Sequence, residues 1–300
     1  MAGALRRAEG NERMAGELAF VGFGEAAQAF AGSLKRDALT GVRGFDLRAD
    51  LASAMAELDV QAGADRQAVL DGAAAVWCLV TADQAEVAVG QCASVLPCGA
   101  FWFDGNSCSP GAKQRAATVI GAAGGRYVDV AIMAPVHPLR AAVPLLLAGP
   151  DAIEGAAYLR ALGMQPAVVG DQVGQASTIK MLRSVMIKGL EALTAECVLA
   201  ARKAGVEEAV LGSLTGSDPG IDWPDRSAYN LERMAVHGRR RAAEMREVAQ
   251  TLADLGLPDR MARACVDWQQ QISDLQVPMA EGEGVTERAD RILAALARGR

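Results

Sequence analysis

A glycine-rich turn between a short apolar run and an amphipathic stretch is the feature that most restricts how this chain can fold. Leu18-Ala19-Phe20-Val21 is predicted to be a buried strand, and a helical pattern opens at Glu25. Between them stands Gly22-Phe23-Gly24, with Ala27 three residues further on. Here the first glycine permits a tight turn, the second lets a pyrophosphate approach the backbone, and the small third residue lets the helix pack on the strand. The pattern predicts a dinucleotide-binding βαβ unit, the alternative being a glycine-rich turn that binds nothing.

The next predicted strand, Val42 to Asp46, ends in an acid that lies 22 residues beyond Gly24. An acid about 20 residues after the glycines is expected to hold the ribose hydroxyls, and its charge repels the extra phosphate of NADP. Asp46 therefore favours NAD, although Arg48 could offset the repulsion and NADP stays open. The predicted cofactor-binding residues are Gly22, Phe23, Gly24, Glu25, Ala26, Asp46, Arg48, Val80 and Thr81.

Strand-like and helical patterns alternate up to about residue 170, and only helical patterns follow. Alternation at this spacing predicts a mostly parallel sheet. We therefore predict an α/β Rossmann-type parallel sheet domain followed by an all-α C-terminal domain. The predicted organisation is a flexible N-terminal extension over 1–16, a dinucleotide-binding domain over 17–170 and a helical substrate and dimerisation domain over 171–300. Among the helices expected are 25–39, 175–204 and 227–255, with 216–224 as a loop.

The composition of the chain argues against two classes of partner, nucleic acids and membranes. The net charge of −6 argues against nucleic-acid binding, which requires positive charge to neutralise phosphates. The basic run Arg239-Arg240-Arg241 lies among glutamates and is predicted to form a solvated or pocket-lining helix face. The most apolar stretch, 72–82, is shorter than the roughly 20 residues that a membrane span needs.

The six cysteines include no CxxC pair, and free thiols in a reducing cytoplasm are the expected state. With two histidines and no His, Cys and carboxylate cluster at ligand spacing, no metal site is predicted. The localisation predicted from these features is cytoplasmic.

Four segments of the chain carry a resemblance to a known superfamily. They are Val21-Gly22-Phe23-Gly24, then 103–110 (Phe-Asp-Gly-Asn-Ser-Cys-Ser-Pro), then Tyr127-Val128-Asp129 with Pro135, and finally Gly174-x-Ala176-x-x-x-Lys180. In this order and spacing the chain resembles the β-hydroxyacid dehydrogenase and 6-phosphogluconate dehydrogenase superfamily from residue 18 to about 270. The segments 180–193 and 237–245 resemble one branch, which has a phosphogluconate-dehydrogenase-like C-terminal domain of poorly defined role.

The resemblance implies that Lys180 is the catalytic lysine, in a cleft between the two domains. An alcohol oxidised by NAD needs a base for its hydroxyl proton, and ketone reduction needs the same group as an acid. A free lysine has a pKa near 10.4, which burial would lower. An exposed lysine on a long helix is the alternative.

The predicted substrate-binding residues are Asn106, Ser107, Met133, Arg183, Ser184 and His237. Each has a structural alternative: Asn106 and Ser107 could cap a helix, Ser184 could fill a helix interface, and Arg183 and His237 could be surface charges or ion-pair partners. The chain also departs from the superfamily at two places. Ser184 stands where an Asn is usual, and Met133-Ala134-Pro135 replaces a Ser-Gly-Gly substrate clamp.

The function predicted from these residues is hydride transfer between NAD(P) and the hydroxyl-bearing carbon of a small, acidic hydroxy compound. An imine reductase of the same architecture and a dinucleotide-binding protein without turnover are the alternatives. A homodimer is expected from the long exposed helical faces in the C-terminal half, and the resemblance implies one as well. Neither nucleic acid nor a membrane is an expected partner.

Overall fold

The computed structural model describes residues 16–37 and 39–298, which belong to two compact units. The first unit comprises Met1–Asn106 and Lys113–Ala176, and the second comprises Ser107–Ala112 and Ser177–Arg300. The predicted N-terminal extension lies outside the described residues except for Gly16, which begins the first strand.

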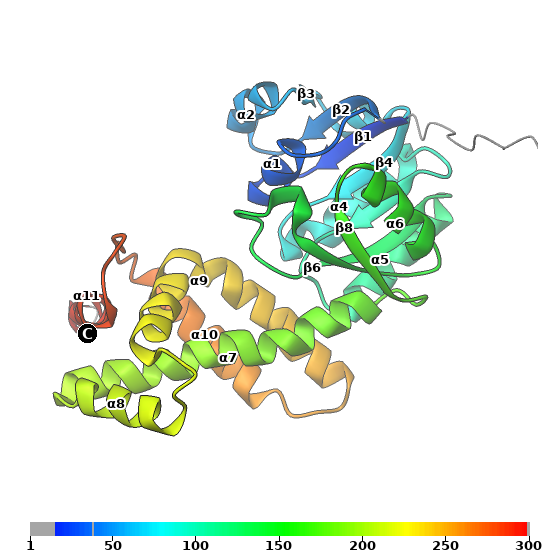
Figure 1. Cartoon of the computed structure of the whole chain (residues 1–300). Coiled ribbons are helices and arrows are strands. Elements are labelled where there is room, and N and C mark those ends of the chain that lie inside the picture. The colour runs from blue at the N-terminus through cyan, green and yellow to red at the C-terminus, as the bar shows by residue number, and fades with distance from the viewer. Residues whose placement is uncertain (1–15, 38, 299–300) are drawn as a thin grey trace, which may run out of the picture. The chain divides into compact units, whose positions relative to one another are not determined.

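The first unit is built on one eight-stranded sheet with the order β3-β2-β1-β4-β5-β6-β7-β8 (Figure 1). Neighbouring strands run parallel except β6 and β7. The predicted α/β fold class is thereby confirmed. The strands are β1 (Gly16–Val21), β2 (Leu39–Phe45), β3 (Gln61–Ala62), β4 (Ala73–Cys78), β5 (Phe101–Asp104), β6 (Arg126–Ile132), β7 (Pro144–Ala148) and β8 (Gln165–Gly170).

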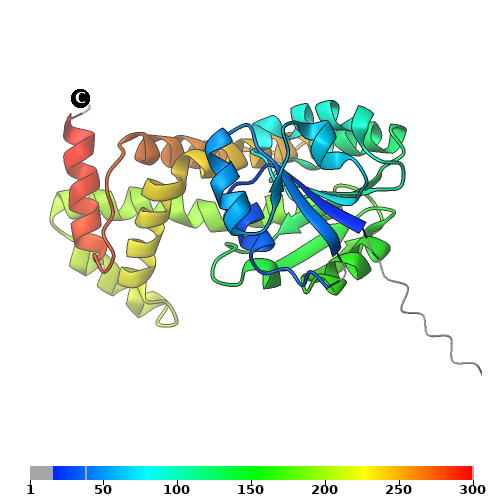
Figure 2. The ribbon, with the colours of Figure 1, turned by 90° about the horizontal axis from the view of Figure 1, so that it is seen from above.

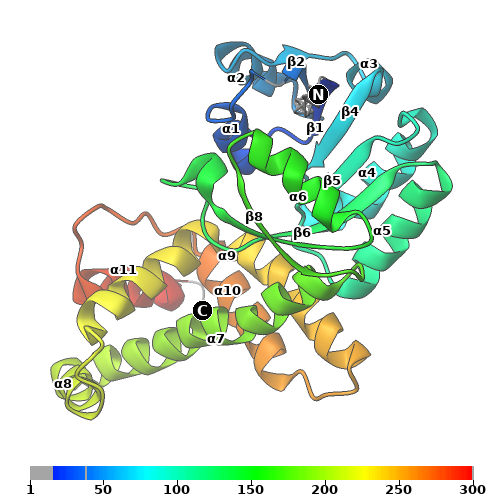
Figure 3. The same cartoon turned by 45° about the vertical axis from the view of Figure 1, so that its right-hand side comes forward.

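Helices cover both faces of this sheet (Figure 3). Their bounds are α1 (Glu25–Ala31), α2 (Ala52–Glu57), α3 (Arg66–Leu70), α4 (Ala85–Cys92), α5 (Pro110–Ala122) and α6 (Ala152–Ala161). One core cluster contains Phe30 of α1, Met55 of α2 and Leu159 of α6, and a separate cluster contains Val69 of α3, Val89 of α4 and Ile120 of α5. Strands buried between two such layers are apolar along their length, which is why their runs were recognisable.

The predicted helix over 25–39 is wrong in its second half. Helix α1 ends at Ala31, Gly32 caps it, and β2 already begins at Leu39. The guanidinium of Arg36 donates to the carbonyl oxygens of Ala31 (2.9 Å) and Leu58 (2.5 Å). The first bond satisfies a carbonyl that a continued α1 would have used, and the second connects the segment after α1 to the end of α2.

The second unit is helical (Figure 2). Its helices are α7 (Gln175–Ala204), α8 (Glu207–Ser217), α9 (Trp223–Asp254), α10 (Arg260–Asp274) and α11 (Val285–Arg298), with α7 entering it at Ser177. The prediction for α7 is confirmed, because its apolar and polar residues repeat at helical spacing without proline. In the part of the chain that the structure covers, no helix is both long and apolar enough to cross a membrane.

The predicted start of α9 at Ser227 is wrong by one turn. The helix begins at Trp223, inside the segment predicted as a loop, and the carboxylate of Asp222 accepts the N–H of Asp225 (3.0 Å) as an N-cap. Pro224 fits in the first turn because that turn needs no N–H donor. The proline that favoured a loop is therefore a helix-starting residue.

A buried charge cluster connects α5 to two strands of the first unit. The ammonium of Lys113, which is fully buried, lies 2.9 Å from an Asp104 carboxylate oxygen and 3.7 Å from one of Asp129. The hydroxyl of Tyr127 donates to the other oxygen of Asp104 at 2.6 Å. Burial and the Asp104 charge raise the pKa of Tyr127 well above its usual value, so the hydroxyl remains a donor.

We expect Lys113→Met to destabilise the protein by about 3–5 kcal/mol, because it leaves two buried carboxylates without their shared cation. Urea unfolding followed by circular dichroism measures the loss. Lys35→Met, which removes an exposed lysine of the same unit, is the control and should change stability by less than about 0.5 kcal/mol. Equal stability of the two variants would show that the cluster does not stabilise the fold.

Candidate functional site

The glycine turn lies where the strand order of the sheet reverses, between β1 and β4. Gly22 has a φ of 87°, and a Cβ atom there would lie 2.5 Å from the carbonyl oxygen of Leu79. Gly24 instead has a φ of −73°, and a Cβ atom there would meet no atom within 4 Å. Gly22 is thus required by the turn itself, whereas the space over Gly24 is open. Ligands of such sheets bind at this reversal.

The carboxylate of Asp46 holds the turn and the end of β2 together. One oxygen accepts the Phe23 N–H at 2.7 Å and the other accepts the Arg48 N–H at 2.9 Å. The Arg48 side chain is exposed and paired with Asp50. This placement puts the Asp46 carboxylate beside the glycine turn. Glu25 is exposed at the start of α1, and Ala26 is half-buried.

Asn106 connects the end of β5 to the segment after β4. Its amide oxygen accepts the Val80 N–H (2.8 Å), and its amide nitrogen donates to Asp104 (2.8 Å). Thr81, the next predicted cofactor residue, is exposed and precedes a short 3₁₀ turn over Ala82–Gln84. The buried amide of Asn106 thus already has partners within the first unit, so its predicted substrate role stays a prediction.

Two residues predicted independently for the chemistry lie together in the second unit. The Lys180 ammonium on α7 donates to the Ser107 hydroxyl at 2.8 Å. Two residues later the Ser109 N–H donates to the Glu247 carboxylate of α9 at 2.6 Å. Segment 107–112 is therefore fixed by α7 on one side and α9 on the other, with Ser107 held at the lysine.

A second set of polar groups continues from Lys180 along α7. The Ser184 hydroxyl donates to the Lys180 carbonyl oxygen (2.9 Å) and accepts from the Lys188 ammonium (3.2 Å). Lys188 lies 2.9 Å from Glu244, which also pairs with Arg240. Burial alone would raise the pKa of Glu244, but the charges of Lys188, Arg240 and Lys180 lower it to about 2.

Lys180 and Ser184 were predicted for the site from sequence, whereas Lys188 and Glu244 were not. The recurrence of Lys180, Ser184 and Lys188 at four-residue intervals was the available signal, since such residues share one helix face. Nothing in the sequence paired that face with Glu244.

Three further predicted residues lie on other segments or at other exposures. Met133 belongs to the first unit, half-buried, with its N–H donating to the Pro144 carbonyl oxygen. Arg183 is exposed on α7, and His237 is half-buried on α9. Their predicted roles stay predictions.

The prediction that 239–241 forms a solvated or pocket-lining face is wrong for one residue. Arg241 is buried and pairs with Glu191 of α7, whereas Arg239 and Arg240 are exposed. Helical geometry turns Arg241 about 100° from its neighbour, onto the face that packs against α7.

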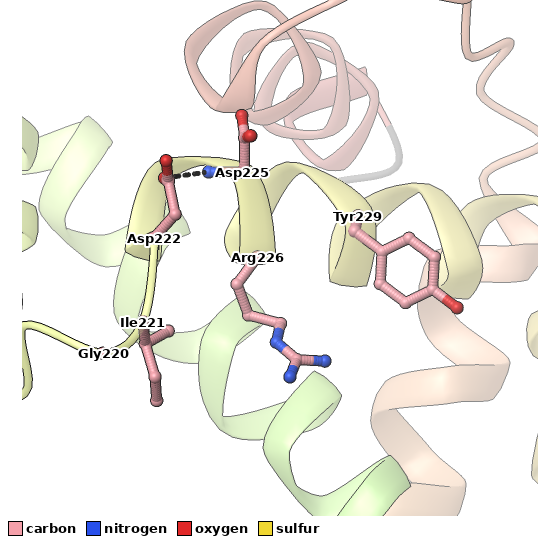
Figure 4. A pocket seen from close by; sticks show the side chains of 6 residues that line it. All are labelled: Gly220, Ile221, Asp222, Asp225, Arg226 and Tyr229. Carbon is pink, nitrogen blue, oxygen red and sulfur yellow. Dashed lines mark hydrogen bonds between the residues drawn. The ribbon is translucent and has the colours of Figure 1, made fainter.

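An open hollow of about 450 Å³ lies at the start of α9 (Figure 4). Its lining is Gly220, Ile221, Asp222, Asp225, Arg226 and Tyr229. The carboxylate of Asp222 is occupied in capping the helix, as the dashed bond shows. The hollow shares no residue with the Lys180 group. Over residues 16–37 and 39–298, no three His, Cys, Asp or Glu side chains are grouped as a metal site would need.

Comparison with known proteins gives three kinds of relative. Residues 201–272 match a family described as a domain of unknown function, DUF1932. A conserved hypothetical protein from Sinorhizobium meliloti 1021 is 38% identical, with 94% of this chain and 96% of that chain covered and a TM-score of 0.72. An uncharacterized 28.5 kDa protein of Methanothermus fervidus is 29% identical over 49% of this chain, and the chain spans only 56% of that relative's length.

More distant structures define the fold. A protein of unknown function reported as similar to 3-hydroxyacid dehydrogenases is 29% identical, covers 86% of this chain and 97% of its own, and has a TM-score of 0.68. Mycobacterium tuberculosis 3-hydroxyisobutyrate dehydrogenase has a TM-score of 0.73 at 14% identity, covering 94% of this chain and 99% of its own. A Streptomyces aurantiacus imine reductase shares the fold at a TM-score of 0.54 and 16% identity, with 93% of this chain and 99% of that chain covered.

The fold and the ordered segments define a class: a Rossmann-type sheet unit with a helical C-terminal unit, as found in NAD(P)-dependent oxidoreductases. Within that class, this chain belongs to the β-hydroxyacid dehydrogenase and 6-phosphogluconate dehydrogenase-like superfamily, in the family of the Sinorhizobium meliloti protein.

Alanine should have different effects at the two glycines of the turn, weakening cofactor binding at Gly24 and lowering stability at Gly22. Gly24→Ala should change stability by less than about 1 kcal/mol yet weaken NADH binding at least about tenfold, because the new methyl occupies the open space over the turn. Gly22→Ala should lose about 1–3 kcal/mol of stability through its strained φ and close contact. NADH fluorescence titration and urea unfolding measure the two effects. Unchanged NADH affinity in Gly24→Ala would exclude this turn as the cofactor site.

Proposed function

We propose that this protein is an NAD(P)-dependent oxidoreductase that transfers hydride to or from the hydroxyl-bearing carbon of a small, acidic hydroxy compound. The observation that carries the proposal is the 2.8 Å bond between Lys180 and Ser107. It joins the two segments whose sequences resemble the catalytic lysine and the substrate loop of the superfamily. A lysine that served only as a solvated helix charge would not need this partner.

The residues of the glycine turn fit a nicotinamide dinucleotide. Gly22 allows the turn, the open space over Gly24 would admit the pyrophosphate, and Asp46 would accept the ribose hydroxyls. When bound, the cofactor supplies the hydride acceptor or donor. The negative charge of Asp46 and the pairing of Arg48 with Asp50 favour NAD over NADP.

The chain's own residues then handle the proton. In alcohol oxidation, neutral Lys180 would accept the hydroxyl proton, and in ketone reduction the ammonium would donate it. Ser107 would orient the lysine and share the bond to the substrate oxygen, since a hydroxyl both donates and accepts. The proton transfer requires a lysine pKa below its usual 10.4, because at that pKa little free amine exists near neutral pH.

An acidic group on the substrate is favoured by the cationic side chains near the lysine in sequence, chiefly Arg183, with His237 on α9. The apolar Met133-Ala134-Pro135 segment, where relatives of the superfamily carry a polar clamp, favours an imine substrate as the second candidate. None of the six cysteines, which all lie in the described part of the chain, forms a disulfide, and this supports a reducing location such as the cytoplasm.

Lys180→Met should lower kcat/KM by about 10²- to 10⁴-fold, because it removes the proton acceptor and keeps the side chain's length. The assay follows absorbance at 340 nm for a panel of 2- and 3-hydroxy acids, with and without phosphate or sulfonate groups, using NAD and NADP. NADH binding should be retained in this variant.

Lys203→Met, an exposed lysine on the same helix, is the matched control and should turn over normally. Retained turnover in Lys180→Met would refute the assignment of Lys180 as the acid/base. Reduction of cyclic imines but no oxidation of hydroxy acids would favour the imine reductase. Tight NADH binding with no turnover of any panel member would indicate a protein that binds the cofactor without catalysis.

A homodimer is part of this proposal, supported by an apolar stripe on α7. Ile179, Leu182, Met186, Leu190 and Leu193 recur at helical spacing and are all exposed. Met186 is 64% exposed and Leu193 is 52% exposed, which is unusual for large apolar residues on consecutive turns. A second copy of the same helix could cover the stripe by two-fold symmetry.

The double variant Met186→Glu with Leu193→Glu should convert the dimer to a monomer, because two carboxylates per chain would be buried without partners. Light scattering coupled to size-exclusion chromatography gives the mass. Ile153→Glu on α6, where a single isoleucine is 74% exposed, is the control and should remain dimeric. A monomeric unmodified protein would refute the dimer.

A further inference from the structure

Lysine is scarce in this chain, which has five lysines against 25 arginines. Lys35 and Lys203 are exposed, and Lys113 belongs to the buried cluster of the first unit. The other two, Lys180 and Lys188, lie eight residues apart on α7. An ammonium changes its pKa readily with its surroundings, whereas a guanidinium stays charged. Where a chain this rich in arginine keeps two lysines on one face, a titratable cation is favoured there.

Lys188 is connected to Lys180 through Ser184. The Lys188 ammonium donates to the Ser184 hydroxyl at 3.2 Å, and that hydroxyl donates to the Lys180 carbonyl oxygen at 2.9 Å. Both Lys188 and Ser184 are buried. A long side chain on a helix points back toward the N-terminus, so Lys188 reaches toward the turn that carries Lys180.

Glu244 supplies the opposite charge from α9. Its carboxylate lies 2.9 Å from Lys188 and 2.9 Å from Arg240, and it is itself buried. The charge of Lys180 also acts on Glu244, as one of the causes that hold its pKa at about 2 against the effect of burial. Because Coulomb interactions are mutual, ionised Glu244 favours the charged form of Lys180.

The elements packed here carry one further buried ion pair and several other titratable groups. Arg241 of α9 pairs with Glu191 of α7, and Gln269 of α10 donates to the same carboxylate at 2.7 Å. The carboxylate of Glu247 accepts the Ser109 N–H. Burial raises the pKa of Cys265 on α10 to about 11, so that thiol stays neutral near neutral pH. Arg183 is exposed and His237 is half-buried.

The Arg241–Glu191 pair is neutral, so the charges that distinguish the surroundings of Lys180 are chiefly those of Lys188 and Glu244. Removing Glu244 makes the net charge there more positive, and removing Lys188 makes it more negative.

We propose that Lys188 and Glu244 are positioning residues that set the protonation state of Lys180. The inference rests on the proposed function, in which Lys180 is the acid/base. The charge of Lys188 disfavours a second positive charge on α7, and the charge of Glu244 limits that effect. The two together set how readily Lys180 changes between its ammonium and amine forms.

Direct titration of Lys180 tests this without any substrate. Protein labelled with [ε-¹³C]lysine should give five side-chain NMR signals, one for each lysine. The signal that is missing from the spectrum of Lys180→Met belongs to Lys180. The chemical shift followed from pH 5 to 11 gives the midpoint of Lys180 in each variant. The same variants are then assayed for the pH dependence of kcat/KM with whichever substrate the panel yields.

The two single variants should move the midpoint in opposite directions, each by about one unit. Glu244→Gln leaves Lys188 uncompensated and should lower it, so that the acid limb of alcohol oxidation moves to lower pH. Lys188→Met leaves extra negative charge and should raise it. The double variant Lys188→Met with Glu244→Gln should return to the original midpoint, and Lys188→Arg should keep it.

Glu191→Gln is the matched control, because it breaks the other buried pair between α7 and α9, about 16 Å along the helix from Lys180. It should lower Tm without moving the Lys180 midpoint. Should a single variant fail to fold by circular dichroism, the double variant and Lys188→Arg carry the comparison. Shifts of both singles in the same direction, no shift in folded variants, or a double variant that does not return would overturn the inference. Turnover that survives Lys180→Met would instead refute the proposed function and leave the titration result standing.

Discussion

The buried carboxylates Asp104 and Asp129 fix the three places where the chain passes between its two units. The chain leaves the first unit after Asn106, returns at Lys113 and leaves again after Ala176. Asn106 and Lys113 both bind Asp104, and Lys113 also lies 3.7 Å from Asp129. Gly174, two residues before the last passage, donates its N–H to Asp129 at 3.1 Å. One charge cluster in the first unit thus anchors every connection to the helical unit.

This anchoring explains why an expensive buried ion cluster is kept in a unit that has two apolar cores. Burying charges is costly unless geometry and additional hydrogen bonds are good, and replacing such a cluster with packed apolar side chains is often neutral or stabilising. Here Tyr127, Asn106 and Lys113 all donate to Asp104. Apolar residues could fill the same volume, but they could not bind Asn106, Lys113 and Gly174, which lie next to the places where the chain passes between its units. The cluster contributes geometry as much as stability.

Much of the fold was predictable from sequence because it follows local rules. Strands buried on both faces are continuous apolar runs, and α7 repeats at helical spacing over its full length. The two errors have different causes. Arg36 binds the carbonyl of Ala31 at the end of α1 and also that of Leu58, a contact 22 residues away that no local pattern predicts. Asp222 is a local signal, a helix cap three residues from its partner, that was outweighed by the proline beside it. In the candidate site, too, single residues could be predicted from sequence but the contacts between them could not. Ser107 and Lys180 were each predicted from motifs, but their contact joins residues 73 apart, and the Lys188–Glu244 pair joins two helices that no local pattern relates.

Helix α7 departs from an ordinary surface helix on both of its sides. Polar residues such as Ser184, Lys188 and Glu191 stand among the apolar ones on its buried side, and the large apolar residues Met186 and Leu193 lie exposed on the other. Such an arrangement costs stability in an isolated chain, because charges are desolvated on one side and apolar area is left in water on the other. Both costs are offset if the buried charges tune Lys180 and the apolar face meets a second copy. The two proposals for this helix therefore support one another: each accounts for one face, and neither face is explained by the fold of a single chain.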